Sequence, residues 1–113
     1  MNHAGGWELQ KIKLDRNGYA PSIFPMPDNC CAICLRTDRP LQRHEVFHGA
    51  NRAKSKALGC WVHLCYECHM QLHQNDNDLD RRLKHNMQRI AMREYGWSIP
   101  QFRERFGKNY LDE

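Results

Sequence analysis

The chain has 113 residues, enough for one compact domain and too few for two ordinary ones, and its formal net charge of +4 fits a polyanionic partner without requiring one. A mean hydropathy of -0.84, with six cysteines and seven histidines, predicts a thin apolar interior that a bound metal would help to stabilise. No apolar run approaches the roughly 18 residues that cross a bilayer, and residues 1–6 lack the layout of a signal peptide, so we expect a cytoplasmic protein that contacts no membrane.

The first 29 residues show no clear helical or strand periodicity. Two glycines in a row at positions 5 and 6 and prolines at positions 21, 25 and 27 interrupt any regular pattern, and the apolar residues are scattered. We therefore interpret residues 1–29 as an irregular lead-in, with room for one short strand near residues 8–14.

A tight turn with two thiols follows the lead-in. Cys31-x-x-Cys34 and the polar residues after it are typical of a zinc knuckle, in which backbone amides face two thiolates. In a reducing compartment, cysteines at this spacing are better interpreted as metal ligands than as disulfides, which remain the lesser alternative. The first pair of ligands is expected here.

Two short strands joined by a polar loop are predicted next. Residues 41–48 carry β-branched and aromatic side chains and end at a glycine, and residues 60–64 carry similar side chains after a glycine. The loop between them, residues 49–59, is polar and basic and suits solvent or phosphate. Three of its cations are candidates for DNA contact: Arg52, Lys54 and Lys56.

Three helices are predicted in the rest of the chain. Helical spacing begins at Tyr66 and stops in the polar residues 74–78, and an apolar face then recurs over residues 79–95. Ser98-Ile99-Pro100-Gln101 is a capping-box start for a short final helix that ends at Gly107. The chain then divides into three parts: the irregular lead-in (1–29), a zinc-bound module (30–75) and a helical extension that packs on the module (76–113).

Two Cys-x-x-Cys pairs form the strongest signal in the sequence. One pair lies on the predicted turn and the other at the first turn of a predicted helix, the arrangement in which a tetrahedral Zn2+ joins a hairpin to a helix. We therefore predict a structural zinc with four ligands: Cys31, Cys34, Cys65 and Cys68.

Other ligand sets remain open. Cys30 permits a different register with Cys34, and a site of three cysteines with His63 or His69 is the main rival. In the four-cysteine site, Cys30 and Cys60 are left over as small buried apolar residues, the usual role of an unliganded cysteine.

A second metal site is predicted from three histidines. His69 and His73 lie four residues apart on a predicted helix, so their rings project from one face at a spacing suited to a shared divalent ion. His44, on the first predicted strand, can complete the site. A lone histidine would be interpreted as an ordinary surface residue, but this pair begins one residue after a predicted zinc ligand, which fixes where the helix points.

The second site also needs a base if it acts on a phosphate. A divalent ion against a phosphate acts as a Lewis acid, and a nearby base must then activate water. Glu45, adjacent to His44, is the available candidate. A regular strand points neighbouring side chains to opposite faces, so the two can share a site only at a bulge or at the end of the strand.

These residues belong to longer stretches of sequence: Cys31-x-x-Cys34, Leu41-Gln42-Arg43-His44-Glu45-Val46-Phe47-His48-Gly49, Leu64-Cys65-x-x-Cys68-His69-x-x-x-His73, Tyr95-Gly96-Trp97 and Phe106-Gly107-Lys108-Asn109-Tyr110-Leu111. Over about residues 28–111 the chain resembles HNH endonucleases of the short phage-encoded type. The resemblance implies a small α+β domain of the zinc-stabilised treble-clef or ββα-metal kind with C-terminal helices. It also implies a structural Zn2+, a catalytic Mg2+ or other divalent ion, and DNA as the substrate.

The resemblance also implies a role for each residue that falls on a functional position of the family. His44 falls on the first metal ligand, and His69 and His73 fall on the helix positions of the metal site. Glu45 stands where the general-base histidine usually stands, and some relatives also read His-Glu, which is consistent with a variant chemistry.

One further position departs from the family. The middle asparagine, expected five residues before Cys65, is Cys60 in this chain. That asparagine normally orients the base, and Asn51 or His63 are the candidates to replace it.

We therefore predict a phage-encoded, metal-dependent DNA endonuclease that serves DNA processing or recombination in the cytoplasm of the bacterial host. The alternative is a non-catalytic, zinc-containing DNA-binding module with incidental histidines. A zinc-stabilised assembly protein without a nucleic-acid partner also fits the size but leaves the histidine pair unexplained. The sequence leaves open whether the chain forms a homodimer.

Overall fold

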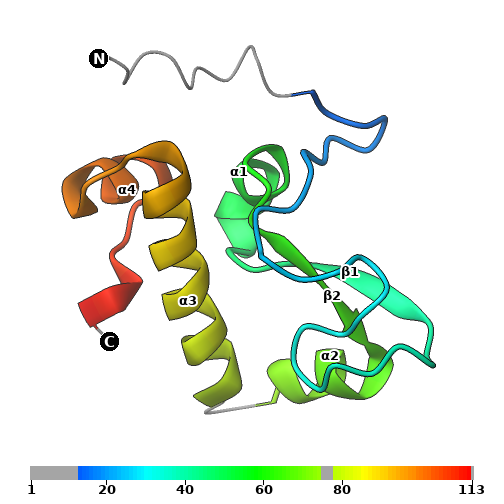
Figure 1. Cartoon of the computed structure of the whole chain (residues 1–113). Helices are drawn as coiled ribbons and strands as arrows, with labels where there is room; N and C mark the ends of the chain where they lie inside the picture. The colour runs from blue at the N-terminus through cyan, green and yellow to red at the C-terminus, as the bar shows by residue number, and fades with distance from the viewer. Residues whose placement is uncertain (1–12, 75–77, 113) are drawn as a thin grey trace.

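A computed structural model of the chain describes residues 13–74 and 78–112. Within them the fold is α+β, with a two-stranded sheet, four α-helices and two short 3-10 helices (Figure 1). In chain order the elements are β1 (Leu41–Glu45), a 3-10 turn (Gly49–Asn51), α1 (Arg52–Ala57), β2 (Trp61–Cys65), α2 (Tyr66–Leu72), α3 (Asp78–Tyr95), α4 (Ile99–Phe106) and a last 3-10 turn (Tyr110–Asp112). None of the described helices is both long and apolar enough to cross a membrane.

The two strands pair antiparallel, and the pairing runs from Leu41 opposite Cys65 to Glu45 opposite Trp61. The predicted first strand is therefore three residues too long, because the chain leaves the sheet after Glu45 and turns at Gly49, whose φ is +71°. α2 follows β2 without a break, so Cys65 both ends the sheet and precedes the helix.

The prediction of a loop over residues 49–59 was wrong, because α1 occupies the centre of this segment. Residues 52–57, with the sequence Arg-Ala-Lys-Ser-Lys-Ala, contain good helix formers and no β-branched residue. Only Ser55 of this helix is buried, and its hydroxyl donates to Cys60 O at 2.6 Å. A helix with a single buried polar residue has no apolar face for a periodicity argument to detect.

The helices of the C-terminal half agree with the sequence patterns. α3 ends just before Gly96, and its predicted cap at residues 76–78 lies mostly outside the described residues. The capping box of α4 is confirmed, with Gln101 N donating to Ser98 Oγ at 3.3 Å and Ser98 N donating to Gln101 Oε1 at 2.8 Å. Gly107 ends the helix in the left-handed conformation.

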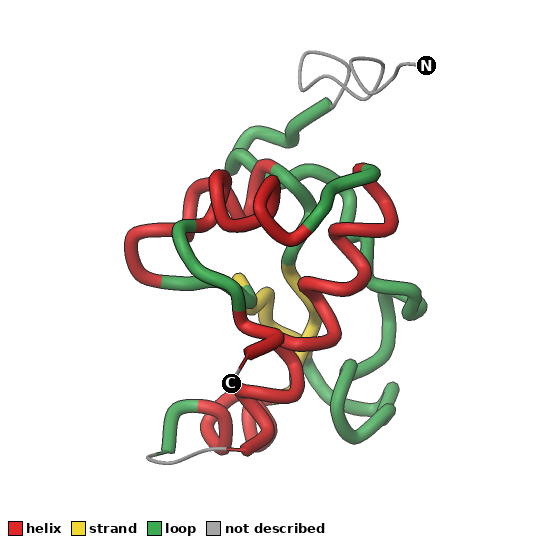
Figure 2. The backbone as a smooth tube through the Cα atoms, turned by 90° about the vertical axis from the view of Figure 1, so that its left-hand side faces the viewer, coloured by secondary structure: helices red, strands yellow, loops and turns green. Residues whose placement is uncertain are grey.

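A single buried core joins the sheet to α3 and α4. Phe47, just after β1, lies with its ring centroid 4.7 Å from that of Phe106 and 5.0 Å from that of Tyr110. Gln88 of α3 is fully buried and satisfied, because its amide bonds Asn109 and the backbone N–H of Tyr110. The C-terminal residues therefore pack on the module, and the strands lie at the centre of the molecule (Figure 2).

The described part of the lead-in, residues 13–29, contains no helix or strand but is bonded to the module. Ala20 N donates to Lys56 O at 2.9 Å, and the Trp61 indole donates to Ala20 O at 2.7 Å. Of the strand expected near residues 8–14, residues 8–12 lie outside the described residues, and residues 13 and 14 are not in a strand.

Gly59 is where the lead-in crosses closest to the module. Its φ is +74°, and a Cβ there would lie 2.3 Å from Pro21 O. Gly107 has a similar φ of +78° but open space around the position of a Cβ. Gly107→Ala is therefore expected to lower the free energy of unfolding by about 1 to 2 kcal/mol, the cost of a left-handed conformation for a residue with a side chain. Gly59→Ala is expected to lower it distinctly more, because the added Cβ would also meet Pro21 O. Urea unfolding of the two variants measures the difference, and equal losses of stability would contradict this close approach.

Candidate functional site

The four predicted zinc ligands lie together. The Sγ atoms of Cys31, Cys34, Cys65 and Cys68 are all within 4.8 Å of one another, and those of Cys34 and Cys65 are 3.8 Å apart. Four thiols at this separation are close enough to hold one metal ion. A site made only of sulfur with four protein ligands is the donor set typical of structural zinc.

The turn that carries the first pair is built to hold a thiolate. Leu35 adopts a left-handed φ of +67°, which closes the turn so that Leu35 N donates to Cys31 O at 2.9 Å. Burial disfavours ionisation of Cys31, but backbone N–H groups of Cys34, Cys65 and Ile33 directed at its sulfur outweigh burial and lower the pKa to about 6. The backbone therefore stabilises the charged sulfur that a metal requires.

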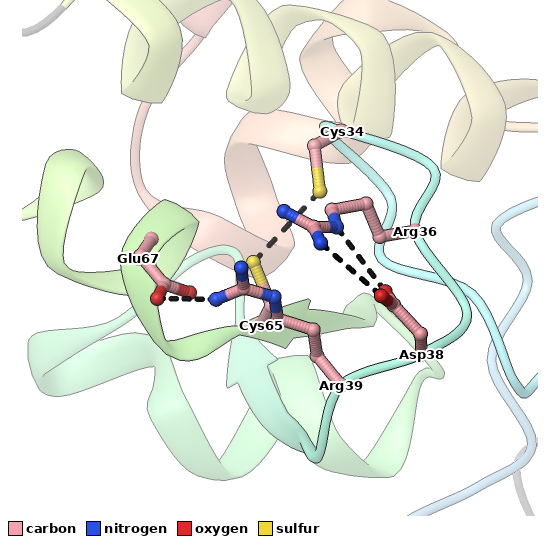
Figure 3. A network of polar contacts seen from close by, with 6 residues as sticks. All are labelled: Cys34, Arg36, Asp38, Arg39, Cys65 and Glu67. Carbon is pink, nitrogen blue, oxygen red and sulfur yellow. Dashed lines mark hydrogen bonds and ion pairs between the residues drawn. The ribbon is translucent and has the colours of Figure 1, made fainter.

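Two ion pairs surround the cysteines (Figure 3). Arg36 bonds Asp38 through two nitrogens, each at 3.1 Å, within the segment after the turn. Arg39 pairs with Glu67, which lies in the first turn of α2. The second pair joins the same two segments that the cysteines bring together, although both pairs are partly exposed and each contributes little stability by itself.

The other two cysteines stay outside this cluster, as predicted. Cys30 and Cys60 are buried, and the Cys30 thiol donates to Cys31 O at 3.4 Å. Burial raises the pKa of Cys60, so it remains a neutral thiol in the core. Among the described residues the cysteine group contains no histidine, so His63 does not replace a thiol, and His69 belongs to a different group.

The three histidines form that second group. One ring nitrogen each from His44, His69 and His73 lies within 4.8 Å of the others, and the ring centroids are 5.0 to 6.0 Å apart. His44 lies on β1, His69 lies on α2, and His73 directly follows α2. Because Cys65 and Cys68 fix the first turn of α2, they also set the direction in which His69 and His73 face β1.

The donor atoms of these histidines suit a metal. His44 is buried, and burial together with its neighbours His69 and His48 lowers its pKa to about 4, so the ring is neutral near pH 7. Its Nε2 is buried with no hydrogen-bond partner among residues 13–74 and 78–112. His69 Nδ1 lies 2.7 Å from Gln42 Oε1, which can only accept, so Nδ1 carries the proton and Nε2 keeps its lone pair.

A pocket of about 320 Å³ opens beside the histidines. Among the described residues, Glu45 is the only carboxylate that lines it, next to His44. The two neighbours share the pocket because Glu45 is the last residue of β1, the condition that the sequence argument required. The full lining is Arg43, His44, Glu45, His48, Gly49, Arg52, His69 and His73.

Glu45 is held from two sides. Its Oε1 accepts a hydrogen bond from Arg52 Nε at 2.8 Å, and its Oε2 accepts one from the hydroxyl of Tyr19 in the lead-in. Burial, and then the bond to Glu45, raise the pKa of Tyr19 to about 12, so the phenol keeps its proton and remains a donor.

The three predicted DNA contacts point in different directions. Arg52 lines the pocket, whereas Lys54 Nζ donates to Arg105 O at 2.7 Å and Lys56 Nζ lies 4.7 Å from the centroid of the Tyr19 ring. They do not form one continuous row toward the histidines.

Neither candidate for the missing asparagine lies in the pocket. Asn51 Nδ2 donates to Phe106 O at 2.9 Å, which joins the start of α1 to the end of α4. The His63 ring packs edge-on against Trp61, with 5.0 Å between the ring centroids, and His63 is absent from the pocket lining.

The sequence analysis missed several residues that line the pocket or bond the residues that line it. Gln42 lies two residues before His44 on β1. Because residues two apart on a strand point to the same face, the sequence could have predicted that Gln42 lies beside the histidines. Arg43 and His48 were also within the motif but were given no role. Tyr19 had no local signal, because it lies in the irregular lead-in and reaches Glu45 only through the fold.

Comparison of the chain with protein-family models, curated proteins and solved structures found no match. The features of the molecule that point to a function are two groups of side chains and a pocket. One group offers four sulfur ligands, and the other offers three nitrogens beside the pocket.

One zinc per chain is expected in purified protein, because the four thiols lie together and the chain has a thin core. Cys65→Ser is expected to lose the zinc and most of the folded structure, whereas the matched variant Cys30→Ala keeps both. Elemental analysis and circular dichroism measure the two effects. A Cys65→Ser variant that stays folded with its zinc would contradict this assignment.

Proposed function

We propose that the chain is an HNH-type DNA endonuclease that cleaves phosphodiester bonds with a divalent ion. The observation that carries the proposal is the group of His44, His69 and His73, with the buried Nε2 of His44 left without a partner among the described residues. In a protein of this size, three convergent ring nitrogens beside a pocket are the donor set of a metal site with open positions.

The proposal includes the fold type. A thiol-bearing turn, the β1 and β2 hairpin and an α2 that starts at the second cysteine pair follow in the order of a treble-clef or ββα-metal domain. Both β1 and α2 contribute to the histidine group, as that type requires. The structural ion in this proposal is Zn2+, and the catalytic ion is Mg2+ or another divalent ion.

The residues have distinct parts in the proposed reaction. The three histidines hold the ion, which supplies Lewis-acid stabilisation of the charge that develops on the phosphate. Glu45 stays the predicted base, because no other carboxylate of residues 13–74 and 78–112 lines the pocket. Each of its oxygens already accepts one hydrogen bond, so the base role uses a remaining lone pair.

DNA is supported as the substrate by the charges of the pocket. Arg43 and Arg52 line it, and the whole chain carries a net charge of +4. Arg43 pairs with Asp15 at 3.1 Å and Arg52 with Glu45 at 2.8 Å, and a phosphodiester would bind to the guanidinium donors that these pairs leave free. The alternative, a non-catalytic DNA-binding module, uses the same zinc and the same cations but gives no role to the group of three histidines.

His69→Ala is expected to lose nearly all divalent-dependent nicking of supercoiled plasmid, because it removes one of three ion ligands. Zinc content and duplex binding are expected to stay at the level of the wild type, since His69 lies outside the cysteine group. His85→Ala on α3, outside the pocket, is the matched control. Nicking by His69→Ala at the rate of the wild type, with every added ion, would contradict the proposed site.

Duplex DNA is expected to bind through cations that include those of α1. Changing Arg52, Lys54 and Lys56 to glutamate is expected to weaken binding. The slope of the logarithm of the binding constant against the logarithm of the salt concentration is also expected to become shallower, by about one unit for each phosphate that the protein no longer neutralises. Fluorescence anisotropy over a range of salt concentrations measures this, and zinc content controls for folding. An unchanged affinity and slope would place the DNA away from α1.

A further inference from the structure

Arg52 and Glu45 form an ion pair in which the carboxylate is buried and the guanidinium is exposed. The Glu45 side chain is 8% exposed, whereas the Arg52 side chain is 67% exposed. The contact uses Arg52 Nε, which donates to Glu45 Oε1 at 2.8 Å. The guanidinium is thus anchored at its inner edge while the rest of it remains accessible from the pocket that it lines.

The anchor is itself fixed by the lead-in. The Tyr19 hydroxyl donates to Glu45 Oε2, the oxygen that Arg52 does not use. Tyr19 is held in turn, because the Arg43 guanidinium lies 4.3 Å from the centroid of its ring and the Lys56 ammonium 4.7 Å from it. A carboxylate bonded on both oxygens cannot rotate freely, so it fixes the plane and direction of the guanidinium.

The guanidinium has donors to spare. Arginine carries five N–H groups in a planar fork, and within residues 13–74 and 78–112 only Nε of Arg52 has a partner. The remaining donors belong to the terminal nitrogens, the pair that binds two oxygens of a phosphate at once. Arg52 shares its pocket with His44, His69 and His73, so a phosphate at the histidines lies within the same enclosure.

We propose that Arg52 binds the phosphate that is cut, and that Glu45 and Tyr19 position its guanidinium for that contact. This inference rests on the proposed function for the identity of the phosphate as a DNA phosphodiester. It gives Glu45, the proposed base, a second role that acts through Arg52.

A simpler role for Arg52 would be to neutralise the buried carboxylate of Glu45. Neutralisation needs one positive charge near Glu45 Oε1, which a lysine also supplies. Phosphate binding needs the planar fork, which a lysine lacks. Arg52→Lys and Arg52→Gln therefore separate the two roles.

The first experiment follows the Nε–Hε resonance of Arg52 by NMR in the zinc-loaded protein, without any added catalytic ion. Arg52→Lys assigns the resonance by its absence. Titration with dimethyl phosphate, and then with a short duplex DNA, is expected to shift this resonance, while that of Arg36, which is paired with Asp38 near the cysteines, stays in place. A resonance of Arg52 that does not move with either probe would overturn the inference.

The second experiment measures nicking by single and double variants. Arg52→Gln is expected to lower kcat/KM by about 10²- to 10³-fold, the usual effect of removing one charged donor to a reacting group, and Arg52→Lys to recover only a small part of that activity. Tyr19→Phe is expected to lower the rate alone but to add nothing in the Arg52→Gln background. Full recovery by Arg52→Lys, or a further large decrease from Tyr19→Phe in the Arg52→Gln background, would overturn the positioning role.

The two experiments distinguish failure of this inference from failure of the proposed function. If the wild type nicks no DNA with any divalent ion while the Arg52 resonance still shifts with dimethyl phosphate, the endonuclease proposal fails and the phosphate site stands. If the wild type nicks DNA while the resonance stays fixed, the endonuclease proposal stands and the role of Arg52 fails. Circular dichroism and zinc content of each variant control for loss of fold.

Discussion

The convergence of four thiols from two distant segments is the constraint on which the rest of the structure depends. Cys65 ends β2 and directly precedes α2, so one residue belongs to the sheet, to the sulfur cluster and to the start of the helix. Fixing that start fixes the helix face on which His69 lies, opposite His44 of β1. The small core contributes the other half of the frame, since Phe47 packs on α4 and the last residues of the chain.

The two groups of ligands differ in the way that structural and catalytic metal sites generally differ. The sulfur group has four protein ligands and needs none from solvent, whereas the histidine group has three and lies beside a pocket. Their donors also differ, because thiolates are soft ligands typical of structural zinc, whereas imidazoles suit several divalent transition metals. Around the second group, Gln42 sets the tautomer of His69, and Glu45 holds Arg52. Helix α2 thus carries ligands of both groups, Cys68 of the sulfur group and His69 of the histidine group.

Short-range patterns predicted the parts of this structure that depend on short-range physics. The Cys-x-x-Cys pairs, the i to i+4 histidines and the capping box of α4 each follow from spacing along a few residues, and the structure brings each together. Helix α1 was missed because its exposed, polar sequence has no apolar face, and tertiary contacts decide its position. The bond from Tyr19 to Glu45 joins residues 26 positions apart, and no local pattern encodes it. For the same reason the directions of Lys54 and Lys56 could not be foreseen, since each is set by a partner elsewhere in the fold.

Crystal diffraction from protein loaded with zinc and then soaked in Mn2+ tests the central claim, two separate metal sites joined through α2, most directly. Anomalous difference maps collected on either side of the zinc and manganese absorption edges identify each ion at its own position. We expect zinc among the sulfurs of Cys31, Cys34, Cys65 and Cys68, and manganese among the ring nitrogens of His44, His69 and His73. A map with zinc at the cysteines and no second ion at the histidines, at saturating Mn2+, would contradict it.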